Sequence, residues 1–219
     1  PGKLVQAGEV REIPADGMFS PGNFHILDLK EMGGPLECFV NGDARALAKH
    51  FPSIARSATT LGRFICRWPG HAAFWEKMVK CGFNRLAPVK VNGAEVVPAA
   101  FCAALLGAQE QFHYGDGERD VALIRADARG AKDGAPVRVV CQLVDYRDLQ
   151  TGYTAMQRTV AFPMSIEAQM ILDGRLAKRG IVEPTEVPFE PLTAELRKRG
   201  LLVTRTVSPW DGGLEPGAG

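Results

Sequence analysis

The chain has 219 residues, of which 46% are hydrophobic and 23% charged, and its formal net charge is +1. This composition is typical of a soluble globular protein and excludes collagen-like, disordered and coiled-coil classes. The near-zero net charge gives no indication of a nucleic-acid partner. The longest apolar stretch, residues 96–108, contains Pro98 and is shorter than the roughly 18 residues of a membrane span, so no membrane contact is expected.

Cysteine usage indicates the compartment. The number of cysteines is odd, and they are widely spaced in apolar surroundings, at Cys38, Cys66, Cys81, Cys102 and Cys141. A secreted disulfide framework is usually paired and denser, so this pattern favours buried thiols in a reducing compartment. No signal peptide is visible at the start, which predicts a cytoplasmic location. The first residue is not methionine, which suggests a part of a longer protein.

The first half of the chain alternates short strands and helices. Residues 1–35, rich in Gly, Pro and Asp, predict an irregular lead-in with one strand-like piece at 3–7. A strand is expected at 37–41, a short helix at 44–50 and a β-favouring run at 57–68. Pro69-Gly70 ends that run, and a helix follows whose apolar positions, Phe74, Trp75 and Met78, are expected in the core.

The second half contains the clearest pattern. Asn92-Gly93 predicts a tight turn, and the alanine- and leucine-rich helix at 98–111 is expected to be buried. Residues 120–146 alternate apolar and charged side chains on both sides of a glycine-bounded turn, which is typical of an antiparallel hairpin. A helical stretch at 154–173 contains Pro163, which should kink or split it. A short helix follows at 193–199, and residues 204–219 are expected to form a flexible tail.

Together these elements predict an α+β fold, with a mixed, largely antiparallel sheet and helices packed on one face. Most of the motifs that identify enzymes are missing. The four histidines lack the spacing of a zinc site, so no metal is expected. The sequence has no nucleophile elbow, no phosphate-binding P-loop and no Gly-x-Gly-x-x-Gly motif. Its cofactor-binding residues, if any, are therefore unknown.

One segment combines groups that could bind and react with a substrate. Arg67 ends a predicted strand, and Gly70 and His71 begin a helix. The first N–H groups of a helix favour an anion, and a guanidinium can hold the same carboxylate through two hydrogen bonds. Gly70 would allow close approach, and His71 could transfer a proton near neutral pH. The alternative is an ordinary Pro-Gly turn in which His71 is merely a polar residue of the first helical turn and Arg67 pairs with a surface acid.

A second polar group lies at the start of the helix predicted over 154–173. Thr154 and Arg158 could face a polar substrate. The alternative is that Thr154 only caps the helix and that Arg158 is a solvated charge; without further information the capping interpretation is preferred.

The same residues carry a family resemblance. Thr60-Leu-Gly-Arg-Phe-Ile-Cys-Arg67-Trp68-Pro-Gly70-His71 resembles the Thr-Leu-Arg-Tyr-Pro-Gly-His segment of the saccharopine dehydrogenase and lysine dehydrogenase family, with an insertion and with Trp68 replacing tyrosine. The resemblance spans residues 36–203. Further matches follow in order, at 89–93, 120–125, 130–134, 154–156, 158–159, 162–163, Ser165 and 195–200.

The resemblance implies a function shared between two domains. In this family a Rossmann domain binds NAD or NADP, and a second domain, resembling the C-terminal domain of glyceraldehyde-3-phosphate dehydrogenase, supplies the substrate site and subunit contacts. Residues 36–203 would be that second domain, without its Rossmann partner. The implied reaction is oxidation of a C–N bond by hydride transfer to nicotinamide, followed by hydrolysis of the imine.

Site roles follow from the resemblance and from the chemistry of the residues. The expected catalytic residue is His71, and the expected substrate-binding residues are Arg67, Trp68, Gly70, Thr154 and Arg158. The substrate would be an amino acid, with saccharopine, lysine and carboxynorspermidine all left open. The partners expected are the Rossmann domain and a second copy of the chain in a homodimer. The competing hypothesis is a dimerisation domain that has lost its dehydrogenase activity.

Overall fold

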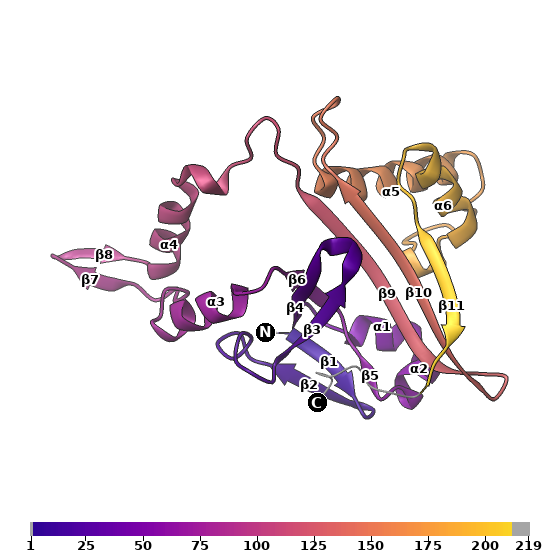
Figure 1. Ribbon diagram of the computed structural model, residues 1–219, viewed down its shortest axis with the longest axis horizontal. Helices are drawn as coiled ribbons and strands as arrows, with labels where there is room; N and C mark the ends of the chain where they lie inside the picture. Colours follow the sequence, from indigo (N-terminus) through magenta and orange to yellow (C-terminus); the bar gives the residue numbers. More distant parts are fainter. Residues whose placement is uncertain (1, 212–219) are drawn as a thin grey trace. The chain divides into compact units, whose positions relative to one another are not determined.

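The computed structural model describes residues 2–211 (Figure 1). Within them the chain forms two compact units, residues 2–112 and residues 113–211. The division between Phe112 and His113 lies inside the stretch 36–203 that was expected to be a single domain. Each unit is described by itself.

The first unit contains two three-stranded antiparallel sheets, ordered β2-β1-β5 and β3-β4-β6. Their strands are β1 (Gly2–Gln6), β2 (Glu9–Ile13), β3 (Phe24–Leu29), β4 (Gly34–Val40), β5 (Thr60–Leu61) and β6 (Phe64–Arg67). The strand-like piece expected at 3–7 is confirmed by β1, whereas the irregular lead-in expected over the rest of residues 1–35 is wrong for β2 and β3. The glycines that suggested irregularity mark turns: Ala7 and Gly8, with φ of 50° and 81°, close the β1–β2 hairpin.

Strand β4 is the central strand of the second sheet. Its run of mostly apolar residues is buried from Leu36 to Val40, because β3 and β6 flank it on both edges. Phe39, which is 1% exposed, packs edge-on against Phe19 and at a tilt against Phe24. The one charged residue in this buried run is Glu37.

The other regular elements of the first unit are helices and one small hairpin. Its helices are α1 (Arg45–His50), α2 (Pro52–Ser57), α3 (His71–Lys80) and α4 (Pro98–Gly107), and the hairpin strands are β7 (Val89–Val91) and β8 (Ala94–Val96). The turn predicted at Asn92-Gly93 is confirmed, since both residues have positive φ. A 3-10 turn spans Lys30–Met32 and another Glu110–Phe112.

Two predictions of burial in this unit are wrong. Helix α4 is apolar around most of its circumference, yet only Cys102 is buried, and Phe101 and Leu105 are each 51% exposed. Phe74 of α3, expected in the core, is also 51% exposed, whereas Trp75 and Met78 are half-buried. The apolar composition of α3 and α4 predicted that their surfaces would be buried, but composition alone does not identify which other element packs against them.

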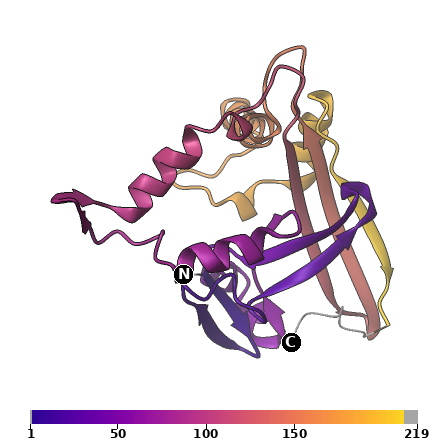
Figure 2. The ribbon, with the colours of Figure 1, turned by 60° about the vertical axis from the view of Figure 1, so that its left-hand side comes forward.

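The second unit is a three-stranded antiparallel sheet with two helices (Figures 1 and 2). The strands are β9 (Val121–Lys132), β10 (Ala135–Tyr146) and β11 (Thr204–Pro209), and the helices are α5 (Ala155–Leu172) and α6 (Phe189–Lys198). The predicted hairpin is confirmed, with Val121 opposite Tyr146, but its turn is shorter than the expected 130–134, because β9 continues to Lys132 and β10 begins at Ala135. A core joins β10, α5 and α6 through buried side chains, namely Leu143, Ile166, Met170, Leu176, Leu196 and Leu201.

Helix α5 runs through Pro163 without interruption, so the predicted split is wrong. Proline removes one intrahelical hydrogen bond and usually kinks or ends a helix. Here Thr159, before the proline, is 8% exposed, and Ile166 and Met170, after it, are 1% and 0% exposed. Packing of buried residues on both sides of Pro163 stabilises the continuous helix and outweighs the low helix propensity of proline.

The end of the chain also differs from expectation. Thr204–Pro209 is not flexible but forms β11, which pairs with β10 over its whole length. Residues 212–219 of the expected tail lie outside the described residues. The α+β class is confirmed, although the strands form several small antiparallel sheets instead of one mixed sheet. Within residues 2–211, no helix has the length and apolar character needed to cross a membrane.

Candidate functional site

The segment from Arg67 to His71 has the predicted order of strand, turn and helix. Strand β6 ends at Arg67, and α3 begins at His71. Gly70 is the N-cap residue of α3 and has φ of 94°, a left-handed conformation that favours glycine. The turn is closed by a long hydrogen bond of 3.4 Å from the backbone N of His71 to the carbonyl O of Trp68.

The start of α3 already holds a carboxylate, that of Glu37. The backbone N of Gly70 donates to Glu37 Oε1 at 2.9 Å, and the backbone N of Ala72 donates to Oε2 at 2.7 Å. The expectation that these N–H groups receive a substrate carboxylate is therefore wrong: the chain itself supplies the anion that the helix start favours. Gly70 shapes the turn, and its N–H is engaged by Glu37.

Glu37 was missed by the sequence analysis because it lies 33 residues before Gly70. It comes from β4, where it is paired in register with Arg67, and it is only 9% exposed. The available signal was a carboxylate inside an otherwise apolar strand. Buried charged groups need partners, so such a residue indicates a specific polar contact.

Arg67 and Trp68 are both exposed. The guanidinium Nη1 of Arg67 donates to the carbonyl O of its neighbour Cys66 at 2.9 Å. Trp68 is 53% exposed. Arg67 is not buried against a core carboxylate, the arrangement that would have removed it from the candidate site. A guanidinium has five N–H donors, so Arg67 retains capacity for a ligand carboxylate.

His71 lies in an aromatic environment at the first turn of α3. Its ring centroid is 5.7 Å from those of Phe19 and Phe39 and 6.1 Å from that of Trp75. Burial lowers the pKa of His71, and the positive charge of Arg67 lowers it further, against an opposing effect of Glu37. The neutral imidazole, which can accept a proton, is therefore favoured at neutral pH.

Thr154 caps helix α5, as the simpler alternative predicted. Its side-chain oxygen accepts from the backbone N of Gln157 at 3.1 Å, and the Gln157 side chain accepts from the backbone N of Thr154 at 2.9 Å. This reciprocal pair is a capping box. A second cap comes from far along the chain, because Asp120 accepts from the backbone N of Ala155 at 2.8 Å and of Met156 at 3.2 Å.

Arg158 is not the solvated charge that the alternative interpretation described. Its Nε donates to Asp145 Oδ2 at 2.8 Å, and the two side chains are only 13% and 10% exposed. The guanidinium also lies 5.5 Å from the ring centroid of Phe162 and 3.6 Å from a carboxylate oxygen of Asp148. Arg158 is thus held in one orientation by groups from β10, α5 and the loop between them.

The structure groups the predicted site residues into two sets. Arg67, Trp68, Gly70 and His71 lie together at the junction of β6 and α3 in the first unit. Thr154 and Arg158 lie together at the start of α5 in the second unit.

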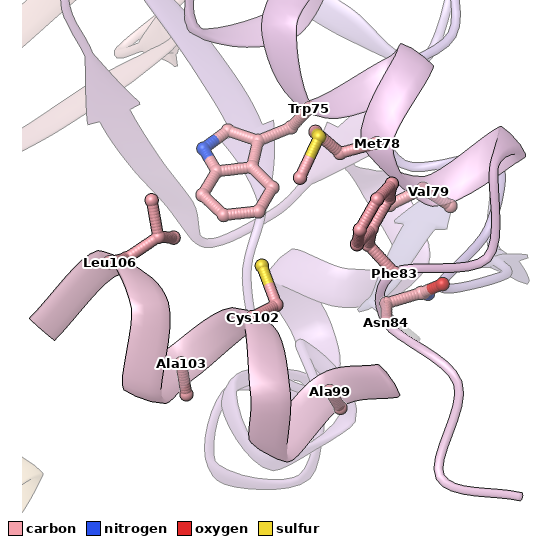
Figure 3. Close-up of a pocket in the computed structure, with 9 residues that line it drawn as sticks. All are labelled: Trp75, Met78, Val79, Phe83, Asn84, Ala99, Cys102, Ala103 and Leu106. Atoms are coloured by element: carbon pink, nitrogen blue, oxygen red, sulfur yellow. The ribbon is translucent and has the colours of Figure 1, made fainter. Parts of the chain in front are cut away.

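An apolar pocket of about 280 Å³ lies between α3 and α4 in the first unit (Figure 3). Cys102 and Leu106 from α4 face Trp75 and Met78 from α3 across it. Apart from the Asn84 amide, its lining side chains are apolar, and none of them belongs to the predicted site. The pocket therefore lacks the polar groups that would orient an amino-acid substrate.

The face of the β9–β10–β11 sheet that points away from Leu143 carries excess positive charge. Three guanidinium groups lie near the same carboxylate oxygen of Asp127. That of Arg138 is 2.6 Å away, that of Arg129 is 3.2 Å away, and that of Arg125 is 3.5 Å away. Burial acts to raise the pKa of Asp127, but hydrogen bonds from Arg138 and Arg129 outweigh it and bring the pKa to about 2. The carboxylate therefore stays ionised, with three arginines around it. Across residues 2–211, no group of three or more His, Cys, Asp or Glu side chains could hold a metal ion.

Comparison with known proteins identifies relatives of this chain. A family profile described as "Saccharopine dehydrogenase C-terminal domain" matches residues 1–201. The chain is 32% identical over 102 residues to the saccharopine dehydrogenase [NADP(+), L-glutamate-forming] of Schizosaccharomyces pombe, covering 46% of this chain and 22% of that protein. It is 31% identical over 94 residues to the mitochondrial alpha-aminoadipic semialdehyde synthase of Bos taurus, covering 42% of this chain and 10% of that protein.

The corresponding protein of Mus musculus is 29% identical over 120 residues, covering 53% of this chain and 12% of that protein. The chain thus spans between about a tenth and a quarter of the length of these relatives. The family match, in contrast, extends over nearly the whole chain. From this match we conclude that the chain belongs to the saccharopine dehydrogenase C-terminal domain family.

Proposed function

We propose that this chain is the substrate-binding and oligomerisation domain of an NAD(P)-dependent amino-acid dehydrogenase that acts on a C–N bond, of the saccharopine or lysine type. Its family membership supports this function. The observation that carries the proposal is the junction of β6 and α3. There an exposed guanidinium, Arg67, and a histidine whose pKa is lowered by burial and by Arg67 lie four residues apart.

In this proposal Arg67 binds the substrate carboxylate. A guanidinium presents two parallel N–H donors to the two oxygens of a carboxylate, which fixes the orientation of the substrate as well as its position. Trp68 offers an exposed ring beside it. Glu37 keeps the turn in place through Gly70 and Ala72. Thr154 and Arg158, expected from the sequence to bind substrate, are engaged within the second unit as the cap of α5 and as the partner of Asp145, so the proposal rests on Arg67 and Trp68.

His71 is the proposed proton acceptor. Hydride loss from the carbon beside nitrogen requires a neutral amine, so the neutral imidazole of His71 takes a proton from the substrate ammonium. The nicotinamide of NAD or NADP, bound mainly by a Rossmann domain, supplies the hydride acceptor. Loss of hydride leaves a C=N bond, water adds to its carbon, and the C–N bond then breaks to give a carbonyl compound and an amine. His71, by then protonated, can return its proton to the departing nitrogen.

The assembly proposed for this domain is a homodimer in the cytoplasm. None of the five cysteines, all within residues 2–211, is in a disulfide, which is consistent with a reducing compartment. The similarity to the C-terminal domain of glyceraldehyde-3-phosphate dehydrogenase remains a prediction. Whether the substrate is saccharopine, lysine or another amino acid depends on groups that contact its side chain.

The test is the variant Arg67→Lys in the protein that carries this chain together with its nicotinamide-binding domain. Lysine keeps the positive charge but loses the planar two-point geometry. A hydrogen bond to a charged group contributes about 1.5–3 kcal/mol, so kcat/KM for the amino acid should fall by roughly one to two orders of magnitude. Steady-state kinetics with saccharopine and with lysine measure this effect.

A matched control is Arg56→Lys, at an exposed arginine in α2, which should leave kcat/KM unchanged. Unchanged kinetics in Arg67→Lys would show that Arg67 does not bind the substrate and that the segment is an ordinary turn between a strand and a helix. An intact protein that binds no nicotinamide and oxidises no amino acid would instead favour the competing hypothesis of a non-catalytic dimerisation domain.

A further inference from the structure

Two cysteines lie directly opposite each other on neighbouring strands of the first unit. Cys38 of β4 pairs in register with Cys66 of β6, and their sulfur atoms are 3.1 Å apart. One thiol donates a hydrogen bond to the other, and neither cysteine is in a disulfide. Cys38 is 1% exposed and Cys66 is half-buried, so Cys66 is the sulfur within easier reach of a small reagent.

The backbone positions allow a covalent bond between these sulfurs. In the same strand pair, the backbone N of Asn41 donates to the carbonyl O of Arg63 at 2.8 Å. Hydrogen-bonded and non-hydrogen-bonded pairs alternate along an antiparallel ladder, which makes Cys38 and Cys66, three positions along, a non-hydrogen-bonded pair. The Cα atoms of such pairs are about 4.5 Å apart, within the range of about 4.4–6.8 Å that a disulfide spans.

The pair is separated from the candidate site by the sheet itself. Successive side chains of a strand point to opposite faces, so Cys38 and Cys66 lie on the face opposite to their neighbours Glu37 and Arg67. A bond between the two sulfurs would therefore join β6 to β4 without displacing Glu37 from the start of α3.

We propose that Cys38 and Cys66 form a reversible intramolecular disulfide when the protein meets hydrogen peroxide. The Cys66 sulfur, as thiolate, attacks one peroxide oxygen and breaks the O–O bond. This gives a sulfenic acid on Cys66, and the departing oxygen leaves as water after taking up the thiol proton. The Cys38 sulfur then attacks the Cys66 sulfur, forming the S–S bond and releasing the second oxygen as water. In total, two thiols lose two electrons and two protons, and one peroxide is reduced to two waters.

The order of these steps follows from the environment of each sulfur. The hydrogen bond with Cys66 raises the pKa of Cys38, and burial raises it further, so Cys38 remains a thiol until Cys66 is oxidised. Thiolates are the reactive form, and buried apolar surroundings disfavour them. The reaction should therefore be slower than that of a cysteine activated by nearby positive charge, and the proximity of Cys38 directs the product to the disulfide.

The experiment treats the native protein with hydrogen peroxide, blocks the remaining thiols with N-ethylmaleimide, and analyses tryptic peptides by mass spectrometry. Cleavage after lysine and arginine places Cys38 in the peptide 31–45 and Cys66 in the peptide 64–67. The expected result is a covalent link between these two peptides that disappears after treatment with dithiothreitol.

Two variants serve as controls. The link should be absent in Cys66→Ala and unchanged in Cys81→Ala, whose cysteine is exposed after the end of α3. The proposal is overturned if Cys38 and Cys66 are both recovered as maleimide adducts after Cys81 has been oxidised, or if either is found linked mainly to another cysteine. Because the linked peptides are identified in the protein without any substitution, this result does not depend on whether Cys66→Ala folds.

Discussion

At the scale of single residues, His71 and Glu37 show how the surroundings decide the chemistry of a side chain. The sequence placed His71 at the start of a helix, where positive charge disfavours a protonated imidazole. In the structure, burial of His71 and the positive charge of Arg67 lower its pKa, while the negative charge of Glu37 opposes this shift. Because the net shift lowers the pKa of His71, the imidazole is neutral over a wider pH range than an ordinary histidine.

This shift predicts the pH dependence of the proposed reaction. A proton acceptor works only when it is unprotonated, so kcat/KM should fall as the pH drops through the pKa of His71, which lies below the ordinary value of about 6.5. In His71→Asn the turnover should be depressed and this acidic limb should vanish, while KM changes little. Rate profiles of both proteins across pH measure the difference; an identical acidic limb in the variant would exclude His71 as the base.

At the scale of elements, α3 and α5, the two helices that carry predicted site residues, both begin at a carboxylate from a distant part of the chain. Helix α3 starts on the carboxylate of Glu37, and α5 starts on that of Asp120, each from a residue more than 30 positions earlier in the chain. In both cases each carboxylate oxygen accepts one backbone N–H. Glu37 lies in β4 and Asp120 lies directly before β9, so these contacts tie each helix start to a sheet and hold His71 and Arg158 at defined positions.

The cap of α3 should contribute measurably to stability. Glu37→Gln removes the negative charge and leaves one of the two N–H groups facing an amide NH2 group. Losing a charge-assisted hydrogen bond at a buried helix start should lower the free energy of unfolding by about 1–3 kcal/mol. Urea unfolding followed by circular dichroism measures this loss. The matched variant Glu9→Gln, at an exposed position of β2, should unfold like the original protein; equal stability of both variants would show that the cap is dispensable.

At the scale of the whole molecule, the chain carries the proposed substrate groups but no phosphate-binding glycine motif. The chain by itself should therefore bind neither NAD nor NADP and should show no dehydrogenase activity. Calorimetric titration of the 219-residue chain with each nucleotide tests this expectation. A dissociation constant in the micromolar range for either one would contradict it, because dinucleotides are usually bound through such a loop and a helix start.

The proposed dimer depends on the sheet of the second unit. The face of this sheet that points away from Leu143 carries charged side chains that are 15–26% exposed and that a second copy could contact, namely Arg125, Asp127, Arg129 and Arg138. The chain should elute and scatter light as a particle of twice its mass of 23.7 kDa. A monomer that persists at high protein concentration would argue against a dimer interface.

Local sequence patterns determined much of the architecture. Alternation predicted the β9–β10 hairpin and which of its side chains share the apolar face, since a shift by one residue would expose that face. Asn92-Gly93, Pro98 and Gly70 marked a turn and two helix starts correctly, because each needs a particular backbone geometry that few residues adopt easily.

Tertiary structure decided what depends on residues far apart in the chain. Glu37 reaches the start of α3 and Asp145 pairs with Arg158 because strand pairing and helix packing bring them there, and no local spacing encodes those contacts. The same reason explains why α5 continues through Pro163 and why Thr204–Pro209 becomes a strand beside β10. Residue type and spacing set which chemistry the chain can perform, whereas burial and contacts between distant strands and helices decided which groups remain able to perform it.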